Sequence, residues 1–396
     1  MKIVLLTSRF PYPLEKGDKL RIYNQIKHLG ENNEVTLITV NNGDVKKGYI
    51  KQLEPYCKDI HIFKLSYLDL GVNLMRALFN GLPFQVGIFF KKKYRGKIQE
   101  IINNVQPDAV YCHLIRMSEY IYGMNGCPKT LDYMDAFSKG IERRAETSSY
   151  FMKRFLEVEH KRLVEYESVV FERFDRKVII SEQDRDCIPH KENWKIEILP
   201  NGVDYEIFHP LDRKKKYDLL FTGNMGYPPN IESAIYTAKE ILPLVQKTHP
   251  DMNLLIAGVN PPRDVVSLHS EKIHVISEFP HIREAFAQSR IMLAPMLISI
   301  GLQNKILQAM AMKIPVVCSS LANNAIKAPL NKCILEANEP SEYAEKIELL
   351  LKDKDFYQSI TCNAYKFVKE NYDWKIINRK LEETILKPSH SIKVVA

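Results

Sequence analysis

The chain has 396 residues, which is too long for one hydrophobic core and predicts two domains of roughly 200 residues each. Its hydrophobic content of 45% and charged content of 26% are typical of a soluble globular protein. The formal net charge of +8 is mild and is compatible with a phosphate-bearing ligand, an anionic membrane surface or nucleic acid.

Seven cysteines are scattered along the chain, and none forms a C-x-x-C pair. This argues against a disulfide framework or a zinc site and indicates a reducing, cytoplasmic compartment. The apolar run 3–6 is too short for a signal peptide and predicts a first β-strand instead. No window holds about 20 uncharged apolar residues, so a membrane span is not expected.

In the first half of the chain, strands alternate with helices. A strand over 2–7 is followed by a Pro-rich loop, and Gly17-Asp18 opens a helix that Gly30 is expected to end. Further strands are predicted at 34–40, 60–65, 108–112, 129–134 and 177–181, and helices at 91–104 and 140–171. This alternation is typical of a parallel sheet flanked by helices.

The alternation of strands and helices is interrupted at 196–210, where a short predicted strand is followed by a Pro-Asn-Gly turn signal. The basic segment 211–216 follows it, and the domain junction is placed here. After this junction the alternation restarts. Strands are predicted at 218–222, 252–257, 273–277, 290–296 and 314–318, and helices at 230–245, 281–289, 303–312, 340–351, 355–371 and 373–386. The tail 387–396 is expected to fray. Ligands of such sheets bind beyond the carboxyl ends of the strands.

Gly301 lies where a loop approaches the start of the helix predicted at 303–312. Free N–H groups and the helix dipole make such a start a ready anion site. The polar residues of the first turn, Gln303, Asn304 and Lys305, are expected to face that anion.

Five segments in a fixed order carry a family resemblance. They are SRFPYPLEKGDKLRIYNQIKHL at 8–29, NGVD at 201–204, FTGNMGYPPN at 221–230, GLQNKILQAMAMKIPVV at 301–317 and ENYDW at 370–374. With these segments the chain resembles the retaining glycosyltransferases of family 4, which have the GT-B architecture. Within them it is similar to bacterial polysaccharide-biosynthesis sugar transferases.

The resemblance implies an α/β GT-B fold of two Rossmann-like domains that face a central cleft. It places an acceptor-binding domain at 1–195, a linker at 196–216 and a nucleotide-sugar-binding domain at 217–372. A helix at 373–396 returns to the first domain and ends in a tail. The implied activity moves a hexosyl unit, with retention, from a nucleotide-diphosphate sugar to a hydroxyl of a lipid-linked polysaccharide or oligosaccharide. No metal and no cofactor is expected.

Mapped onto this sequence, the resemblance places Gly17 and Asp18 in a loop that faces the donor diphosphate. Gly223 and Asn224 fall in the first loop of the second domain, also near the phosphates. The family often has an arginine after that glycine and a lysine soon after it, and both are absent here. Lys305 is the candidate replacement, as a point charge that offsets the charge growing on the departing diphosphate.

The family also has two glutamates eight positions apart, one beside the donor sugar and one bonded to the ribose. The matching residues here are Ile300 and Gln308. Gln308 keeps an acceptor oxygen for a ribose hydroxyl, whereas Ile300 has none. Backbone groups around Gly301, or the side chains of Gln303 and Asn304, are the candidates for the sugar hydroxyls.

His113 and Asp135 are the candidate catalytic residues because each follows or ends a predicted strand. Some family members have a histidine near His113 that contacts the reacting sugar; the alternative is a satisfied surface histidine. Asp135 would orient an acceptor hydroxyl, while Asp132 is expected within its strand. Asp184-Arg-Asp186 matches a metal-binding D-x-D, but it is expected to start a helix, and no metal is predicted.

Residues 82–97 combine aromatic side chains with five cations, a composition that suits the surface of an anionic bilayer. This would place the protein peripherally on the inner face of the cell membrane. The alternative is that Phe89 and Phe90 belong to the core and that the cations begin a helix. No nucleic-acid motif occurs, so nucleic acid is not expected as a partner.

Two other functions stay open. A nucleotide-sugar epimerase can share this architecture and needs no acceptor, so product analysis with donor alone separates it from a transferase. A catalytically weak GT-B-like binding protein is suggested by Gln308 and Ile300, which replace the two acids.

Overall fold

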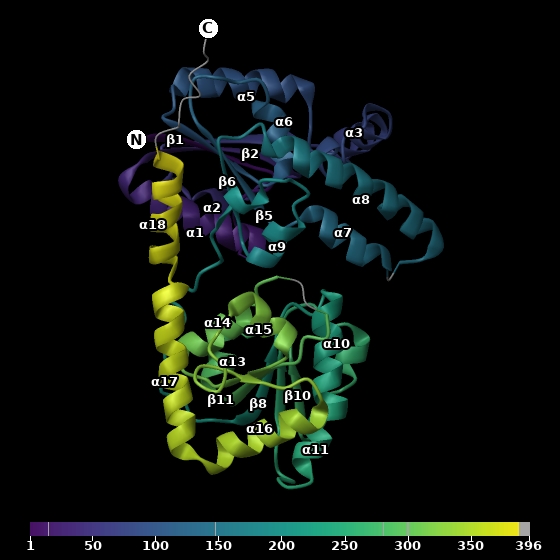
Figure 1. The fold of residues 1–396 in the computed structure, drawn as a ribbon, viewed down its shortest axis with the longest axis vertical. Helices are drawn as coiled ribbons and strands as arrows, with labels where there is room; N and C mark the ends of the chain where they lie inside the picture. Colours follow the sequence, from purple (N-terminus) through teal and green to yellow (C-terminus); the bar gives the residue numbers. More distant parts are fainter. Residues whose placement is uncertain (15, 147, 280, 299–300, 388–396) are drawn as a thin grey trace. The chain divides into compact units, whose positions relative to one another are not determined.

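The computed structural model describes residues 1–14, 16–146, 148–279, 281–298 and 301–387. Ile300 and the tail beyond 387 lie outside the described residues, as do the predictions made for them. The chain divides into two compact units, which are coloured along the sequence in Figure 1. Unit 1 comprises Met1–Pro200 and Ile377–Ala396, and unit 2 comprises Asn201–Ile376.

Unit 1 is built on a parallel sheet with the strand order β3-β2-β1-β4-β5-β6-β7. The strands are β1 (Lys2–Thr7), β2 (Glu34–Asn42), β3 (Asp59–Leu65), β4 (Ala109–His113), β5 (Lys129–Met134), β6 (Arg176–Ile179) and β7 (Glu197–Ile198). The central strand β1 is buried on both faces, as its continuous apolar run requires. Val4 and Leu6 join one apolar cluster, and Ile3 and Leu5 join the other.

Helices cover both faces of this sheet (Figure 1). They are α1 (Gly17–Asn32), α2 (Lys47–Ile50), α3 (Tyr67–Asn80), α4 (Phe84–Gly87), α5 (Lys92–Val105), α6 (Ser118–Ile121), α7 (Phe137–Glu146), α8 (Tyr150–Phe171) and α9 (Glu182–Cys187), with 3-10 turns at Glu54–Tyr56, Ile115–Met117 and Asn193–Lys195. The single helix predicted at 140–171 is wrong, because α7 and α8 are separate.

Gly30 does not end α1, contrary to the prediction, since the helix continues to Asn32. A Cβ atom at Gly30 would lie 2.2 Å from the carbonyl oxygen of Tyr56. The glycine is therefore explained by close packing of the following 3-10 turn and not by helix termination.

The last helix, α18 (Trp374–Leu386), returns to unit 1 as predicted. Its Leu381 and Ile385 are fully buried in the cluster that contains β1 residues. The Asn378 side chain donates a hydrogen bond to the carbonyl oxygen of Asn24 at 3.0 Å, and Asn33 donates to Glu382 at 2.6 Å. These contacts fix α18 against α1.

Unit 2 repeats the plan with a parallel sheet of order β10-β9-β8-β11-β12-β13. The strands are β8 (Tyr217–Thr222), β9 (Leu254–Ala257), β10 (Ile273–Ile276), β11 (Ser289–Ala294), β12 (Val316–Cys318) and β13 (Leu335–Glu336). Its helices are α10 (Pro228–Tyr236), a π-helical turn (Thr237–Ile241), α11 (Leu242–Gln246), α12 (Arg263–Val266), α13 (Ile282–Ala287), α14 (Asn304–Ala311), α15 (Ser320–Ile326), α16 (Pro340–Lys352) and α17 (Lys354–Asn371).

Each sheet has a point where the strand order reverses. In unit 1 this point lies between β1 and β4, and in unit 2 between β8 and β11. Loops diverge there at the carboxyl ends of the strands, which leaves a crevice suited to ligands. The residues beyond these strand ends are therefore where each unit should carry its chemistry.

The aromatic side chains of the segment 82–97 are less exposed than the membrane-surface prediction requires. Phe84 is buried, and Phe89 and Phe90 pack against the core of unit 1, while Lys92 begins α5. The structure thus shows the alternative, in which these aromatic residues are core. Across the described ranges, no helix combines the length and the apolar character that crossing a bilayer requires.

Candidate functional site

In unit 1, the strand ends bring together most of the residues predicted there. His113 ends β4, Asp135 follows β5, and Asp18 lies in the first turn of α1, next to Gly17. Two neighbouring residues, Leu114 (φ 69°) and Met134 (φ 64°), have positive φ, which is uncommon outside glycine. Such backbone strain at strand ends is frequent in functional sites.

A group of charged side chains surrounds Asp18. Arg9 donates from Nη1 to Asp18 Oδ2 at 2.8 Å. Burial by itself would raise the pKa of Asp18, but the positive potential of Arg9, His113 and Arg116 outweighs it, and the pKa is lowered. These residues and Asp135 are called the strand-end cluster below. The cluster is rich in cations and can hold an anion or orient a polar substrate.

The pKa of Asp135 is shifted in the opposite direction, upward. Burial first, and then the nearby carboxylate of Asp184, raise its pKa to about 7. The residue as a whole is half-buried, but its Oδ1 atom is inaccessible and has no hydrogen-bond partner among the described residues. A carboxyl group that titrates near neutrality can accept a proton from a substrate hydroxyl.

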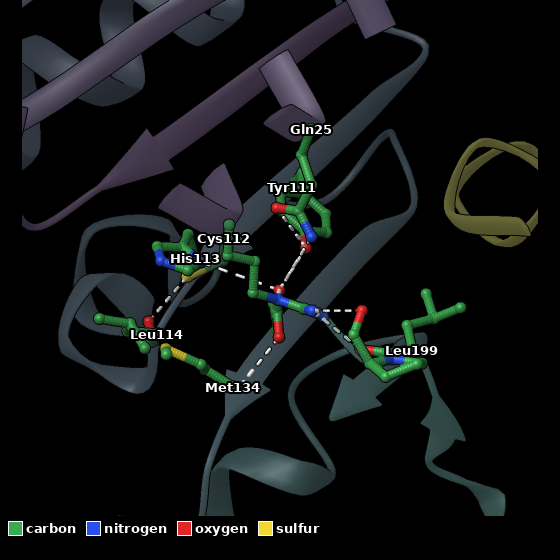
Figure 2. A network of polar contacts seen from close by, with 10 residues as sticks. Gln25, Tyr111, Cys112, His113, Leu114, Met134 and Leu199 are labelled. Atoms are coloured by element: carbon green, nitrogen blue, oxygen red, sulfur yellow. Dashed lines mark hydrogen bonds and ion pairs between the residues drawn. The ribbon is translucent and has the colours of Figure 1, made fainter. Parts of the chain in front are cut away.

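Next to this cluster lies a fully buried ion pair between Arg21 and Asp132. Figure 2 shows the polar network to which it belongs, with Gln25, Tyr111 and Leu199 labelled. Arg21 Nε donates to Asp132 Oδ2 at 2.6 Å, and the hydroxyl of Tyr111 donates to the same oxygen at 2.6 Å. Although burial alone would raise it, the charge of Arg21 holds the pKa of Asp132 far below its usual range. Arg21 Nη1 also donates to the carbonyl oxygen of Leu199 at 2.8 Å. Leu199 lies one residue before Pro200, where the chain leaves unit 1.

His113 lies between this ion pair and the strand-end cluster. Its Nδ1 atom is 3.8 Å from Asp132 Oδ2, and only 3% of its side chain is exposed. Neither ring nitrogen has a hydrogen-bond partner in the ranges that the structure describes. His113 is therefore buried, and the alternative of a satisfied surface histidine is wrong. A buried imidazole beside a carboxylate that lies beyond hydrogen-bond distance can still take a hydrogen bond from a ligand.

The D-x-D sequence starts a helix, as expected. Asp184 is hydrogen-bonded to Ser181, which caps α9, and Arg185 pairs with Asp186 at 2.9 Å. Within the described residues, no group of three or more His, Cys, Asp or Glu side chains could hold a metal ion.

In unit 2, the corresponding strand ends are made of close-packed backbone. Gly223 follows β8, and Gly258 follows β9. A Cβ atom on Gly258 would lie 1.7 Å from the carbonyl oxygen of Gly223, and one on Gly223 would lie 2.8 Å from the Asn230 side chain. Position 258 therefore requires glycine, because a Cβ there would meet backbone, and position 223 favours glycine, because a Cβ there would meet the amide that Lys305 holds. The two loops thus pack backbone to backbone at one edge.

Asn224 shapes the first of these loops. Its Oδ1 accepts the N–H of Gly226 at 2.9 Å, and its carbonyl oxygen accepts from Asn230 Nδ2 at 2.9 Å. The residue is exposed. Asn224 is uncharged, so it adds no positive charge to the loop. Its hydrogen bonds instead hold the turn that leads into α10.

Lys305 lies in the first turn of α14 but points into unit 2. Its Nζ atom donates to Asn230 Oδ1 at 2.6 Å and lies 3.6 Å from Met296 Sδ and 4.6 Å from the centre of the Phe221 ring. Burial lowers its pKa to about 7. The side chain thus ties α14 to α10, and at neutral pH it carries only part of a positive charge.

The remaining predicted donor residues surround the start of α14. Gly301 has φ 63°, and Gln303 donates from Nε2 to the Gly301 carbonyl oxygen at 3.3 Å. Gln303 precedes the helix without a side-chain cap, and its carbonyl oxygen accepts the N–H of Ile306 at 3.0 Å, so the N–H groups of Asn304 and Lys305 precede the first bond of the helix. Asn304 has a buried Oδ1 without a partner among the described residues, and Gln308 is half-buried one turn further on.

Several residues of these sites escaped the sequence analysis. Arg9 and Arg116 follow β1 and β4 within a few residues, so their place after a strand was an available signal. Asn230 had a weaker signal as the last residue of the FTGNMGYPPN segment. Arg21 had none, because its partner Asp132 lies 111 positions away in the chain.

A known protein family resembles unit 2 in sequence, and solved structures resemble both units. Residues 216–353 match the family model described as glycosyl transferases group 1. This match covers β8, β11 and α14, and thus every donor-binding candidate of unit 2.

A relative that matches almost the whole chain comes from Klebsiella pneumoniae. It is described as an uncharacterized 44.6 kDa protein in the cps region, and it is 26% identical over 400 residues, which cover 94% of this chain and 97% of the relative.

Solved structures match over both units. Sucrose-phosphate synthase from Thermosynechococcus elongatus has a TM-score of 0.69 at 13% identity and covers 97% of this chain and 98% of its own. Anabaena HepE, solved with UDP, has a TM-score of 0.68 at 14% identity and covers 97% and 99%. The fold is GT-B, as predicted. Together with the family match of unit 2, it supports a glycosyltransferase.

Proposed function

We propose that the protein transfers a hexosyl unit from a nucleotide-diphosphate sugar to a hydroxyl of a polysaccharide or oligosaccharide acceptor, with retention at the anomeric carbon. The donor binds at the strand ends of unit 2, and the acceptor at those of unit 1. The nucleotide sugar is a substrate, and the reaction uses no resident cofactor or metal.

One observation carries the donor assignment. The segment that matches the glycosyl transferases group 1 model contains the glycine edge at Gly223 and Gly258 and the uncapped start of α14. Backbone N–H groups at a helix start bind phosphate oxygens without needing arginine, and glycine lets a ligand approach the loop backbone closely. This accounts for the absence of the usual cationic side chains after Gly223.

The roles of the donor residues follow from their contacts. The N–H groups at the start of α14, with Gln303 and Asn304 beside them, bind the diphosphate and the sugar hydroxyls. Gln308 offers its amide oxygen to the ribose. Lys305 acts through Asn230, because its ammonium group holds the Asn230 side chain, which in turn shapes the loop at Asn224. Negative charge on bound phosphate would favour the protonated form of Lys305.

In unit 1, Asp135 accepts the proton of the acceptor hydroxyl, for which its pKa near 7 is suitable. His113 donates or accepts a hydrogen bond to the reacting sugar, and the Arg21–Asp132 pair holds it in place from below. Arg9 and Asp18, next to Gly17, position polar groups at the same edge. Exclusion of water by substrate binding limits hydrolysis of the donor.

The acceptor class rests on the relative from a cps region, which supports a role in polysaccharide biosynthesis. The proposal adds that the acceptor is lipid-linked and that transfer takes place in the cytoplasm. The donor class is supported by HepE, which has also been solved with UDP-glucose. A uridine nucleotide is therefore the first to test, with guanosine, adenosine and cytidine nucleotides beside it.

The test is product analysis with a panel of nucleotide sugars, each with and without glycan acceptors. The proposal expects acceptor-dependent release of nucleoside diphosphate and an extended glycan whose new linkage keeps the donor's anomeric configuration. A changed sugar formed from donor alone would identify an epimerase instead. Binding without turnover by wild type, converted to turnover by Gln308→Glu, would identify a catalytically weak binding protein.

A further inference from the structure

Helix α3 exposes an apolar stripe that the rest of the protein leaves uncovered. Leu68, Val72, Met75 and Phe79 recur at a spacing of three or four residues and are all exposed, with Leu68 at 82% and Phe79 at 85%. Tyr67 extends the stripe at the start of the helix. The surface along it is open, and the residues that line it all come from α3. Among these lining residues there is none from a second element, so this side of the helix is uncovered.

The stripe is not a helix that has failed to pack. The opposite side of α3 buries Ala77 and Asn73, and the Asn73 side chain donates to the carbonyl oxygen of Ile88 at 3.0 Å. Ser66 and Asp69 form a capping box at its start. The helix is held firmly on unit 1 and presents its apolar side outward.

Helix α8 carries a second stripe with the same spacing. Phe151, Phe155 and Val158 are exposed, with Phe151 at 86%. The two helices are joined, because Arg162 of α8 donates to the carbonyl oxygens of Ala77 and Leu78 at 2.6 and 3.1 Å. We call the two stripes together the α3–α8 face, after the two helices that carry them, which are labelled in Figure 1.

Cations border this face. Between residues 67 and 97 the sequence has six lysines and arginines and one acid, Asp69, which is already paired with Lys91. Arg76 and Lys92 line one hollow beside α3. Within the described ranges, Arg76, Lys92 and Lys93 have no carboxylate within ion-pair distance.

The chemistry of the α3–α8 face selects its occupant. A second copy of the chain applied to the same face would bring its own cations against these, which is unfavourable. An anionic bilayer offers both complements, because aromatic and aliphatic side chains enter the zone between headgroups and acyl chains while lysines and arginines contact the headgroup charges. Apolar side chains exposed this far are uncommon on soluble monomers and mark interaction sites.

We propose that the α3–α8 face docks unit 1 on the surface of an anionic lipid bilayer. The contact uses the apolar stripes of two helices and the cations beside α3, in place of the aromatic residues at 84–90, which are packed inside. The proposal suits a lipid-linked acceptor but does not depend on transferase activity, because docking is measured without any substrate.

The test is cosedimentation of the full chain with vesicles of phosphatidylcholine alone and with 30 mol% phosphatidylglycerol (about one lipid in three anionic). We expect binding to the anionic vesicles. A Phe79→Ser/Phe151→Ser variant should lose more than tenfold in partition coefficient. An Arg76→Gln/Lys92→Gln/Lys93→Gln variant should lose roughly 100-fold, at about fivefold for each cation near the surface.

The control variants replace exposed apolar side chains and exposed cations of unit 2 in the same way. Val266→Ser/Leu349→Ser removes two exposed apolar side chains, and Lys214→Gln/Lys239→Gln/Lys247→Gln removes three exposed cations. Both controls should bind as wild type does. All variants change exposed residues, so their melting temperatures should match wild type and confirm that folding is intact.

Several outcomes would overturn the proposal. These are no binding to anionic vesicles, equal binding to neutral and anionic vesicles, or equal losses in the control variants. Self-association in sedimentation velocity that Phe79→Ser/Phe151→Ser abolishes, without vesicle binding, would assign the face to a second copy of the chain.

Discussion

The two units have similar sheets, but their strand ends carry different chemistry. In unit 1 the edge holds titratable side chains, with Asp18, His113 and Asp135 close to one another above a buried ion pair. In unit 2 the edge is made of glycine backbone and amides, and its cation, Lys305, is turned inward. The same scaffold thus provides a site for proton handling in one unit and a site for close backbone approach to phosphate in the other.

Burial brings one group in each unit to a pKa of about 7, but with opposite effects on stability. Asp135 has a raised pKa, so the folded protein binds more protons than the unfolded chain, and stability falls as pH rises from about 4 to about 7. Lys305 has a lowered pKa, so the unfolded chain binds more protons, and stability rises as pH increases from about 7 to about 10.

The largest effect is expected at the ion pair beneath the unit 1 site. Asp132→Asn removes the partner of a fully buried guanidinium, and unit 1 should lose about 3–5 kcal/mol in free energy of unfolding. Urea unfolding followed by hydrogen exchange of β1 and β4 amides measures it. Glu34→Gln, which breaks the exposed Lys58–Glu34 pair, should change little. Equal effects of both substitutions would show that Arg21 is not held as a buried charge.

Asp135→Asn tests the proton-handling role of unit 1. The wild-type transfer rate should rise with pH and level off above about 7, where Asp135 is ionised. The variant should lose about 100-fold in rate at pH 8 and lose this pH dependence. Asp186→Asn, at an exposed position of α9, is the matched control. A variant that keeps the same rise near pH 7 would assign it to another group.

Gly258→Ala tests the backbone contact in unit 2. The added Cβ meets the Gly223 carbonyl oxygen, so the loops must separate, and unit 2 should lose about 2–3 kcal/mol in free energy of unfolding. Donor affinity should fall as well, since both loops belong to the proposed site. Gly140→Ala, where nothing lies within 4 Å, should leave stability unchanged or slightly higher. Unchanged stability of Gly258→Ala would contradict the close approach.

The smallest effect concerns Lys305. Between pH 7 and 8, the free energy of unfolding of unit 2 should rise by about 1 kcal/mol in wild type. In Lys305→Met this rise should disappear. Lys239→Met, at an exposed position of the π-helical turn, should keep it. Chemical unfolding at four or five pH values is sufficient, and parallel curves for wild type and Lys305→Met would contradict the burial of its ammonium group.

The sequence predicted the features that follow from local pattern. Alternating strands and helices predicted both sheets. Placement at or after a strand end led to His113 and Asp135, which the structure puts at the ends of the adjacent strands β4 and β5. Long-range contacts could not be predicted in this way. Nothing near Arg21 in sequence points to Asp132, and the direction in which Lys305 points depends on Asn230, 75 positions away.

One error and one omission have a common physical origin. The aromatic residues at 84–90 seemed exposed because cations follow them, yet Phe84 stacks on Phe155 of α8, and Phe89 and Phe90 pack against the core. The helix α3 was not predicted, and its exposed apolar stripe has the same 3.6-residue period as a helix that faces the core. Periodicity shows that a helix has two sides, but only the tertiary structure shows which side is covered.

The central claim is that unit 2 binds the donor through its glycine edge and the start of α14. Hydrogen exchange with and without UDP, and with the other nucleoside diphosphates, tests it most directly. We predict that one nucleotide slows exchange of the amides at 223–226, 258–260 and 304–306 but leaves those of β4 and β5 unchanged. Protection absent from unit 2 with every nucleotide, or confined to the strand ends of unit 1, would contradict the account.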